Sequence, residues 1–178
     1  MNCVYIYGDS GTGKATLAKR MAKQQNYSVC VSSGSNDVLD GYQGQDCIIL
    51  DDLRPSCLGL SDLLKLLDNH TASTVKSRYA NKVLECKLII VTTTLPLTHF
   101  FKNVFQEEQE TAVQLKRRCE TVIHMQMSGC TFYTYNPELR EHVYTTKIPN
   151  PIEFVREVYS KEQALAGIRK LMNGLVDG

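Results

Sequence analysis

Short runs of consecutive apolar residues, rich in β-branched side chains, recur along most of the chain. They occupy residues 2–7, 27–31, 46–50, 87–94 and 120–125. Near-continuous apolar runs of this length are typical of strands that are covered on both faces, as in a mostly parallel sheet. The pattern therefore predicts a central sheet that is buried on both sides.

Segments with helical spacing alternate with these runs. Residues 14–25 and 60–67 place apolar side chains on one face of a helix, and further helices are expected at 96–105 and 107–118. Strands that alternate with helices predict an α/β fold, with a mostly parallel sheet flanked by helices, over residues 1–125.

The pattern changes after residue 125. Residues 131–149 resemble two strands joined at an Asn-Pro-Glu turn, which predicts a hairpin, and one or two helices are expected over 151–173. We expect residues 126–178 to form a small hairpin-plus-helix extension that packs on the core and is not an independent domain.

The composition and charge predict a single cytosolic domain whose cysteines are reduced. The chain has 178 residues and a net charge of +1, so any contact with nucleic acid has to come from a local basic patch. The seven cysteines include no C-x-x-C pair, which argues against a disulfide framework and a zinc ribbon. No apolar run has the length of a membrane span, and residues 1–14 do not resemble a signal peptide.

A glycine-rich phosphate loop, residues 8–15, follows the first predicted strand. Its sequence GDSGTGKA matches G-x-x-x-x-G-K-[ST] except at the last position. Glycines let backbone N–H groups surround a phosphate, and the N-terminus of the next helix favours its negative charge. Lys14 is expected to reach the β- and γ-phosphates of ATP. The predicted nucleotide-binding residues are Gly8, Asp9, Ser10, Gly11, Thr12, Gly13, Lys14, Ala15 and Thr16.

Ala15 stands where a Ser or Thr hydroxyl ordinarily binds Mg²⁺. Thr16 follows, but one residue along a helix turns the side chain by about 100 degrees. Mg²⁺ is therefore expected to depend mainly on a carboxylate and water. The sequence supports nucleotide binding more strongly than fast hydrolysis.

Two carboxylates, Asp51 and Asp52, end another apolar run, 37 positions after Lys14. A strand-end aspartate suits a magnesium ligand, and an adjacent acid can deprotonate the attacking water. Asp51 is predicted to bind Mg²⁺, through water, and Asp52 to act as the catalytic base. The alternative is an Asp-Asp turn that only ends a strand, which the nearby phosphate loop disfavours.

The order of the motifs resembles a known family. The phosphate loop, the Asp-Asp strand, the basic segment VKSRYANKVLECK and a strand ending in TTT-LP follow at tight spacing. This arrangement resembles the superfamily 3 helicase domain of rolling-circle replication initiator (Rep) proteins, found in small plasmids and small circular single-stranded DNA viruses. DDLRPS, LLKLLDNHT and SRYANK look most like the bacterial plasmid branch. The resemblance covers residues 1–125.

The resemblance implies an AAA+-like phosphate-loop NTPase that uses ATP and Mg²⁺. Such domains form hexameric rings around single-stranded DNA and translocate 3′ to 5′, with ATP at the subunit interfaces. Their third motif ends in an Asn that contacts the γ-phosphate or the attacking water. Thr94 stands at that place here and lacks the second functional group of the amide.

The resemblance also implies residues that contact DNA and a neighbouring subunit. The family has a DNA-gripping hairpin between its second and third motifs, for which this chain offers Lys76, Arg78, Tyr79 and Lys82. A solvated polar hairpin is the alternative. An arginine finger is expected near the last core strand, where Arg117 and Arg118 are both candidates. Helix C-terminal arginines that only complement the helix dipole are the alternative there.

Three functions fit these features. The favoured one is an ATP-driven DNA helicase domain, and the others are a nucleotide-binding assembly module on DNA without efficient turnover and a small-molecule phosphate-loop kinase. The His pair and tyrosine of a nicking domain are not found, so we expect a fragment or a stand-alone domain, monomeric in isolation. A bacterial cytoplasmic location is expected, and a nuclear one only for a viral origin.

Overall fold

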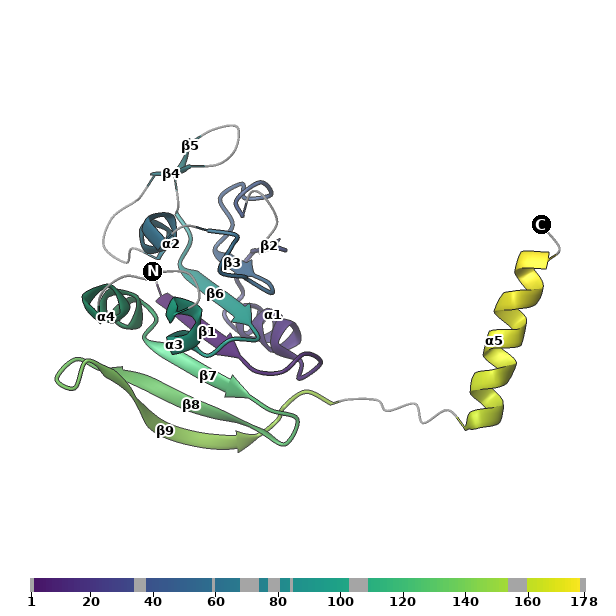
Figure 1. The fold of residues 1–178 in the computed structure, drawn as a ribbon. Helices are drawn as coiled ribbons and strands as arrows, with labels where there is room; N and C mark the ends of the chain where they lie inside the picture. The colour runs from purple at the N-terminus through teal and green to yellow at the C-terminus, as the bar shows by residue number, and fades with distance from the viewer. Residues whose placement is uncertain are drawn as a thin grey trace.

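The computed structural model describes residues 2–33, 38–58, 60–67, 74–76, 81–83, 85–102, 109–153 and 160–176. Within these ranges, a seven-stranded sheet has the order β2-β3-β6-β1-β7-β8-β9 (Figure 1). Its strands are β1 (Asn2–Tyr7), β2 (Val29–Ser32), β3 (Cys47–Leu50), β6 (Leu88–Thr93), β7 (Thr121–Met125), β8 (Gly129–Asn136) and β9 (Glu141–Pro149). The other elements are α1 (Lys14–Gln24), α2 (Leu60–Leu66), α3 (Leu97–Lys102), α4 (Gln109–Arg118), α5 (Lys161–Val176) and the hairpin β4 (Thr74–Lys76) and β5 (Asn81–Val83). This is the predicted α/β fold of the phosphate-loop type.

The phosphate-loop strand and the acidic strand end at the same edge of the sheet. β1, β6 and β3 run parallel, with β6 in the middle, and the register pairs Val91 with both Tyr5 and Leu50. In open α/β sheets, ligands bind outside the carboxyl ends of the strands. This topology therefore brings the loops after β1, β3 and β6 together.

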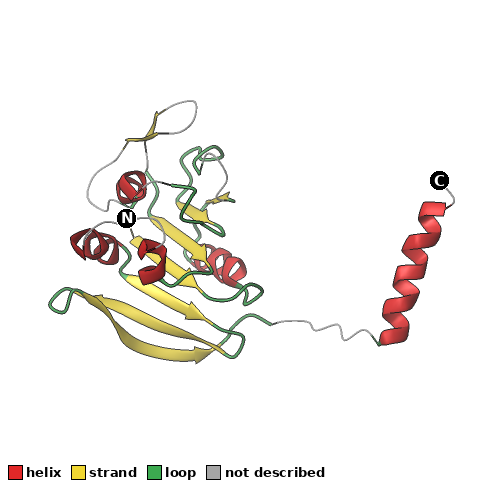
Figure 2. Ribbon diagram, in the orientation of Figure 1, coloured by secondary structure: helices red, strands yellow, loops and turns green. Residues whose placement is uncertain are grey.

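Side chains of the sheet enter two apolar layers, because successive residues of a strand point to opposite faces. Tyr5, Ile48 and Ile89 lie in the layer that also holds side chains of α2, α3 and α4. Ile6 and Ile49 lie in the opposite layer, which includes side chains of α1. Figure 2 shows helices on both sides of the sheet, and the prediction of strands covered on both faces is confirmed for β1, β3 and β6. It is wrong for β2, because Val29 and Val31 of this edge strand are exposed.

The prediction of helix over 151–173 is wrong in its first part. Helix α5 begins only at Lys161, and residues 150–153 are not helical. The Asn150 side chain accepts the N–H of Ile152 at 2.9 Å, and Ile152 is buried beside the phosphate loop. Because Ile152 is buried against the phosphate loop, residues 150–153 take a non-helical conformation instead of the predicted helix.

The two parts of the region after β7 lie differently. β8 pairs antiparallel with β7, and β9 pairs with β8, so the hairpin extends the central sheet. Helix α5 stands apart from the sheet in Figure 1, and its Leu165, Ile168 and Met172 are exposed. The hairpin is thus part of the central sheet, whereas the packing of residues 126–178 as an extension stays a prediction. None of the described helices is long and apolar enough to cross a membrane.

Candidate nucleotide-binding site

The backbone of the phosphate loop requires glycine at two positions. Gly8 has a φ of 149°, and a Cβ at this position would lie 2.0 Å from the carbonyl oxygen of Met125. Gly13 has a φ of 91°, and its carbonyl accepts the N–H of Leu17 at 2.9 Å at the start of α1. Only glycine adopts such angles readily, because it has no Cβ. The loop therefore ends at the N-terminus of α1, where free backbone N–H groups favour the binding of an anion.

The Lys14 side chain bends back over the phosphate loop. Its Nζ donates to the carbonyl oxygens of Gly8 at 2.8 Å and Asp9 at 2.7 Å. Partial burial lowers the pKa of Lys14 from its ordinary value, and the charges of Asp52, Asp9 and Asp51 oppose that shift. An ammonium group has three donors, so one remains for an incoming phosphate without breaking either bond.

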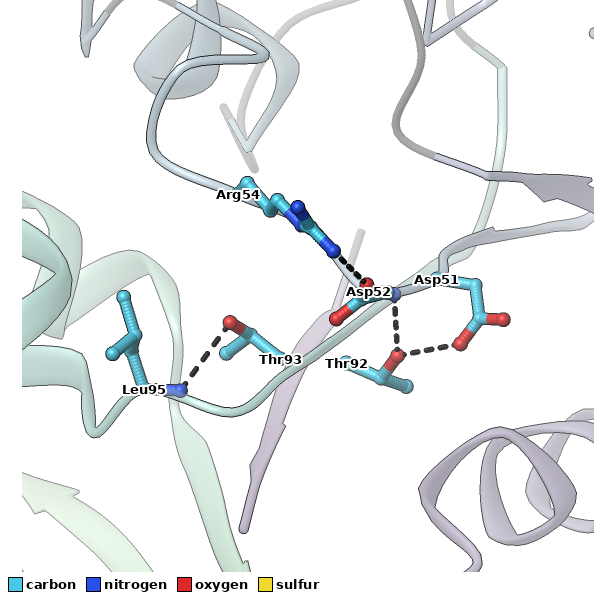
Figure 3. A network of polar contacts seen from close by, with 6 residues as sticks. All are labelled: Asp51, Asp52, Arg54, Thr92, Thr93 and Leu95. Atoms are coloured by element: carbon cyan, nitrogen blue, oxygen red, sulfur yellow. Dashed lines mark hydrogen bonds and ion pairs between the residues drawn. The ribbon is translucent and has the colours of Figure 1, made fainter. Parts of the chain in front are cut away.

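The two carboxylates after β3 are held differently. The hydroxyl of Thr92 donates to Oδ1 of Asp51 at 2.7 Å and accepts the backbone N–H of Asp52 at 3.0 Å (Figure 3). Asp52 has a φ of 51°, and its exposed carboxylate contacts only Arg54 among the described side chains, at 3.3 Å. Thr92 thus orients Asp51, while Asp52 faces solvent at the mouth of the site.

Two adjoining cavities connect the phosphate loop with the acidic turn. The smaller, of about 280 Å³, is lined by Ser10, Gly11, Gly13, Lys14, Ala15, Thr16, Asp51, Asp52, Thr92 and Thr94. The larger, of about 660 Å³, is lined by Ser10, Asp52, Leu53, Arg54, Pro55, Ser56, Thr93, Thr94 and Leu95. The structure therefore brings most of the predicted phosphate loop together with the predicted Asp51, Asp52 and Thr94.

The oxygen-bearing side chains of the smaller cavity suit a magnesium ion that also binds the phosphates of a nucleotide. Asp51 and Thr16 both line this cavity, so a hydroxyl-bearing residue stands one position after Ala15 along α1. No group of three His, Cys, Asp or Glu side chains that could hold a metal gathers within the described ranges. Mg²⁺ ordinarily binds through one or two carboxylates, water and substrate phosphates, and Asp51 fits that mode.

The arginines predicted as fingers lie at the other edge of the sheet. Both end α4, which precedes the amino end of β7, whereas Gly8 approaches the carboxyl end of β7. Arg117 is exposed. Arg118 donates to the carbonyl of Gln114 at 3.1 Å, and its buried Nε has no partner among the described residues. Neither arginine lines either of the two cavities described above.

The structure describes the predicted DNA hairpin in part. Lys76 ends β4 and Lys82 lies in β5, and these antiparallel strands pair Lys76 with Asn81. Arg78 and Tyr79 lie outside the described residues. The neighbouring Lys87 is occupied by an ion pair with Asp46 at 2.8 Å. Hydrogen bonds from Lys87 and Ser28 lower the pKa of Asp46 to about 2.

Three residues at the site were missed by the sequence analysis. Thr92 is one of three consecutive threonines, and only its strand position could have distinguished it from Thr94. Arg54 lies two positions after Asp52, and this closeness in the sequence was the available signal. Asn150 donates to the carbonyl of Thr12 at 3.1 Å across 138 positions, for which no sequence signal exists.

A comparison with protein families agrees with this arrangement. A family model described as RNA helicase matches residues 4–95. The chain belongs to the RNA helicase family. The matched segment of this helicase-family chain runs from β1 past the end of β6 and contains the phosphate loop, the acidic turn and Thr94. It ends before α4, so the match does not include Arg117 and Arg118.

The helicase-family chain is also similar to a named protein. It is 49% identical over 175 residues to the replication protein of Onion yellows phytoplasma (strain OY-M). The aligned part covers 97% of this chain and 46% of that protein. The chain thus spans about half the length of this relative.

Proposed function

We propose that this chain is the ATP-driven motor domain of a plasmid-type replication initiator and that it moves 3′ to 5′ along single-stranded DNA. The observation that carries the proposal is the convergence of Lys14, Asp51, Asp52 and Thr94 on one cavity at the carboxyl edge of the sheet. The family match and the similarity to a phytoplasma replication protein support it. The same similarity supports a place of action in the bacterial cytoplasm.

In this proposal, the polar side chains that converge on the cavity have separate tasks in ATP hydrolysis. The loop N–H groups and Lys14 bind the β- and γ-phosphates, and Thr94 orients the attacking water. Asp52 accepts a proton from that water while the water oxygen bonds to the γ-phosphorus. The bond between the γ-phosphorus and the bridging oxygen, which stays with ADP, breaks. Mg²⁺, held by Asp51 and assisted by Thr16, would neutralise phosphate charge.

The strand order supports an AAA+-like type of motor. β6 lies between the phosphate-loop strand β1 and the acidic strand β3, so Thr94 leaves the sheet between the two motifs. A residue at that point is placed to contact both the γ-phosphate and the acidic turn. We propose residues 1–125 as the motor core and residues 126–178 as its extension.

The position of Arg117 supports assembly into a ring. β7 places about 15 Å of strand between the end of α4 and the phosphate-loop edge. An arginine finger from α4 therefore has to act on the ATP of another copy. In a hexameric ring, each copy would present its α4 end to the cavity of its neighbour.

Replacing Arg117 by alanine is expected to lower hydrolysis about tenfold at high protein concentration, because one charge-assisted contact is lost. The rate per chain should then no longer increase with protein concentration. Arg118→Ala is the comparison, since Arg118 already bonds its own helix. A steady-state titration measures both, and a concentration-dependent rate that survives in Arg117→Ala would contradict this assignment.

We propose that the β4–β5 hairpin contacts the DNA backbone through Lys76, Arg78 and Lys82, with Tyr79 stacking on a base. The lysines supply local positive charge in a chain of net charge +1. The relative is named a replication protein, whereas the family is described as RNA helicase, so DNA and RNA have to be compared directly.

ATP hydrolysis is expected to increase several-fold with single-stranded DNA and less with single-stranded RNA. Lys76→Ala and Lys82→Ala should each reduce this stimulation. Each should also lower the salt dependence of DNA binding by about 0.7 in log–log slope, because one phosphate contact is lost. Lys147→Ala, at an exposed position of β9, is the matched control. Equal stimulation by RNA would overturn the proposed substrate.

Ala15 favours a second candidate, a module that assembles on DNA and binds nucleotide without efficient turnover. It lines the cavity but carries no hydroxyl for Mg²⁺. The same hydrolysis experiment separates the two candidates. Measurable ATP binding with a negligible rate, unchanged by protein concentration and by DNA, would favour the module over the motor.

A further inference from the structure

We propose that Asn150 is a positioning residue for the phosphate loop, acting from a strap formed by residues 150–152. This inference rests on the proposed nucleotide-binding function. The strap follows β9 and lies outside the segment that matches the helicase family. It crosses the phosphate loop on its way from the central sheet to the C-terminal region.

The Asn150 amide joins two loops of the protein. Its Nδ2 donates to the carbonyl of Thr12 at 3.1 Å and to the carbonyl of Gln126 at 2.8 Å, while its Oδ1 accepts the N–H of Ile152 at 2.9 Å. Carbonyl oxygens can only accept and a backbone N–H can only donate, so these partners fix the orientation of the amide. The side chain thus links the phosphate loop to the β7–β8 turn.

Ile152 supports the loop from the same strap. It is 8% exposed, and its Cγ1 and Cγ2 atoms lie 3.0 Å from the position that a Cβ on Gly13 would occupy. The carbonyl of Pro151 accepts a hydrogen bond from Arg20 of α1 at 2.8 Å. The strap is therefore attached to α1 as well as to the loop.

None of these contacts uses a backbone N–H group of the phosphate loop, so those groups stay available to a phosphate. Thr12 is turned inward, with its hydroxyl donating to the carbonyl of Asp9 at 2.9 Å, and its carbonyl is held by Asn150. Fixing the Thr12 peptide fixes the adjacent N–H of Gly13, which the phosphate-loop motif directs at a phosphate. Asn150 thereby sets the geometry of the anion site without touching the nucleotide.

Two substitutions separate this role from a merely structural one. Asn150→Ala removes all three hydrogen bonds, whereas Asn150→Asp keeps an acceptor for Ile152 and loses both donors. Both are expected to raise the Kd for a fluorescent ADP analogue about tenfold. Both should also raise KM for ATP by a similar factor and change kcat less than twofold. Asn136→Ala is the matched control, because Asn136 accepts two N–H groups in the β8–β9 turn at the far end of the same hairpin.

Hydrogen exchange of the Leu17 amide, which donates to the carbonyl of Gly13 at the end of the loop, tests the strap without nucleotide and independently of the proposed function. Exchange is expected to accelerate in both Asn150 variants and to stay at the wild-type rate in Asn136→Ala. Unchanged exchange in Asn150→Ala would overturn the inference even if nucleotide binds. An effect limited to Asn150→Asp would also overturn it, since added negative charge would then be the cause. Faster exchange in a protein that binds no nucleotide would refute the proposed function alone.

Discussion

Replacing Lys14 by alanine is expected to reduce ATP hydrolysis about 1000-fold, the largest effect of any single side chain in the site. Lys14 is the cation of a cavity whose wall also holds Asp51 and Asp52. Without the ammonium group, the γ-phosphate would meet two carboxylates with no compensating side-chain charge from the cavity lining. Nucleotide affinity should fall by about 10- to 100-fold, because hydrogen bonds to a charged group are lost.

Lys19→Ala provides the matched control for Lys14→Ala. Lys19 is exposed on the same helix, so the substitution removes the same charge and keeps a good helix-forming residue. Steady-state hydrolysis and thermal unfolding with and without ADP should be measured on both variants. ADP should stabilise Lys19→Ala like the wild type and Lys14→Ala much less at the same concentration. Wild-type turnover by Lys14→Ala would exclude the cavity as the site of hydrolysis.

The sequence predicted the parts of the site that local geometry determines. Gly8, Gly13 and Lys14 belong to one turn between a strand and a helix, so a short motif includes them all. Asp51 and Asp52 end a strand, and their chemistry follows from that place. The structure adds that Thr92 holds Asp51 across 41 positions, a contact that requires β3 and β6 to be neighbours.

The contacts that the sequence did not predict depend on tertiary packing. Asn150 reaches Thr12 only because β8 and β9 continue the sheet and return the chain to the phosphate-loop edge. The same return explains why a helix was wrongly predicted from residue 151. Burial of Ile152 against Gly13 outweighs any local preference for helix there.

Replacing Asp52 by asparagine is expected to reduce kcat about 100- to 1000-fold, because the amide cannot accept a proton from the attacking water. Asparagine suits this position, since Asp52 has a φ of 51° and asparagine tolerates left-handed backbone better than most residues. Its side-chain oxygen can still accept from Arg54, and the backbone N–H keeps its bond to Thr92. The fold and the Kd for nucleotide should therefore stay near wild type.

Asp51→Asn distinguishes loss of the base from loss of the metal ligand. The amide oxygen can still accept the Thr92 hydroxyl, so the acidic turn keeps its conformation, but the charge that attracts Mg²⁺ is gone. Hydrolysis by Asp51→Asn should need more Mg²⁺ and recover in part as Mg²⁺ is raised, whereas Asp52→Asn should stay inactive at every Mg²⁺ concentration. The opposite pattern would exchange the two roles. Normal turnover in both variants would mean that neither carboxylate takes part, because nothing else in the described cavity lining can act as a carboxylate base.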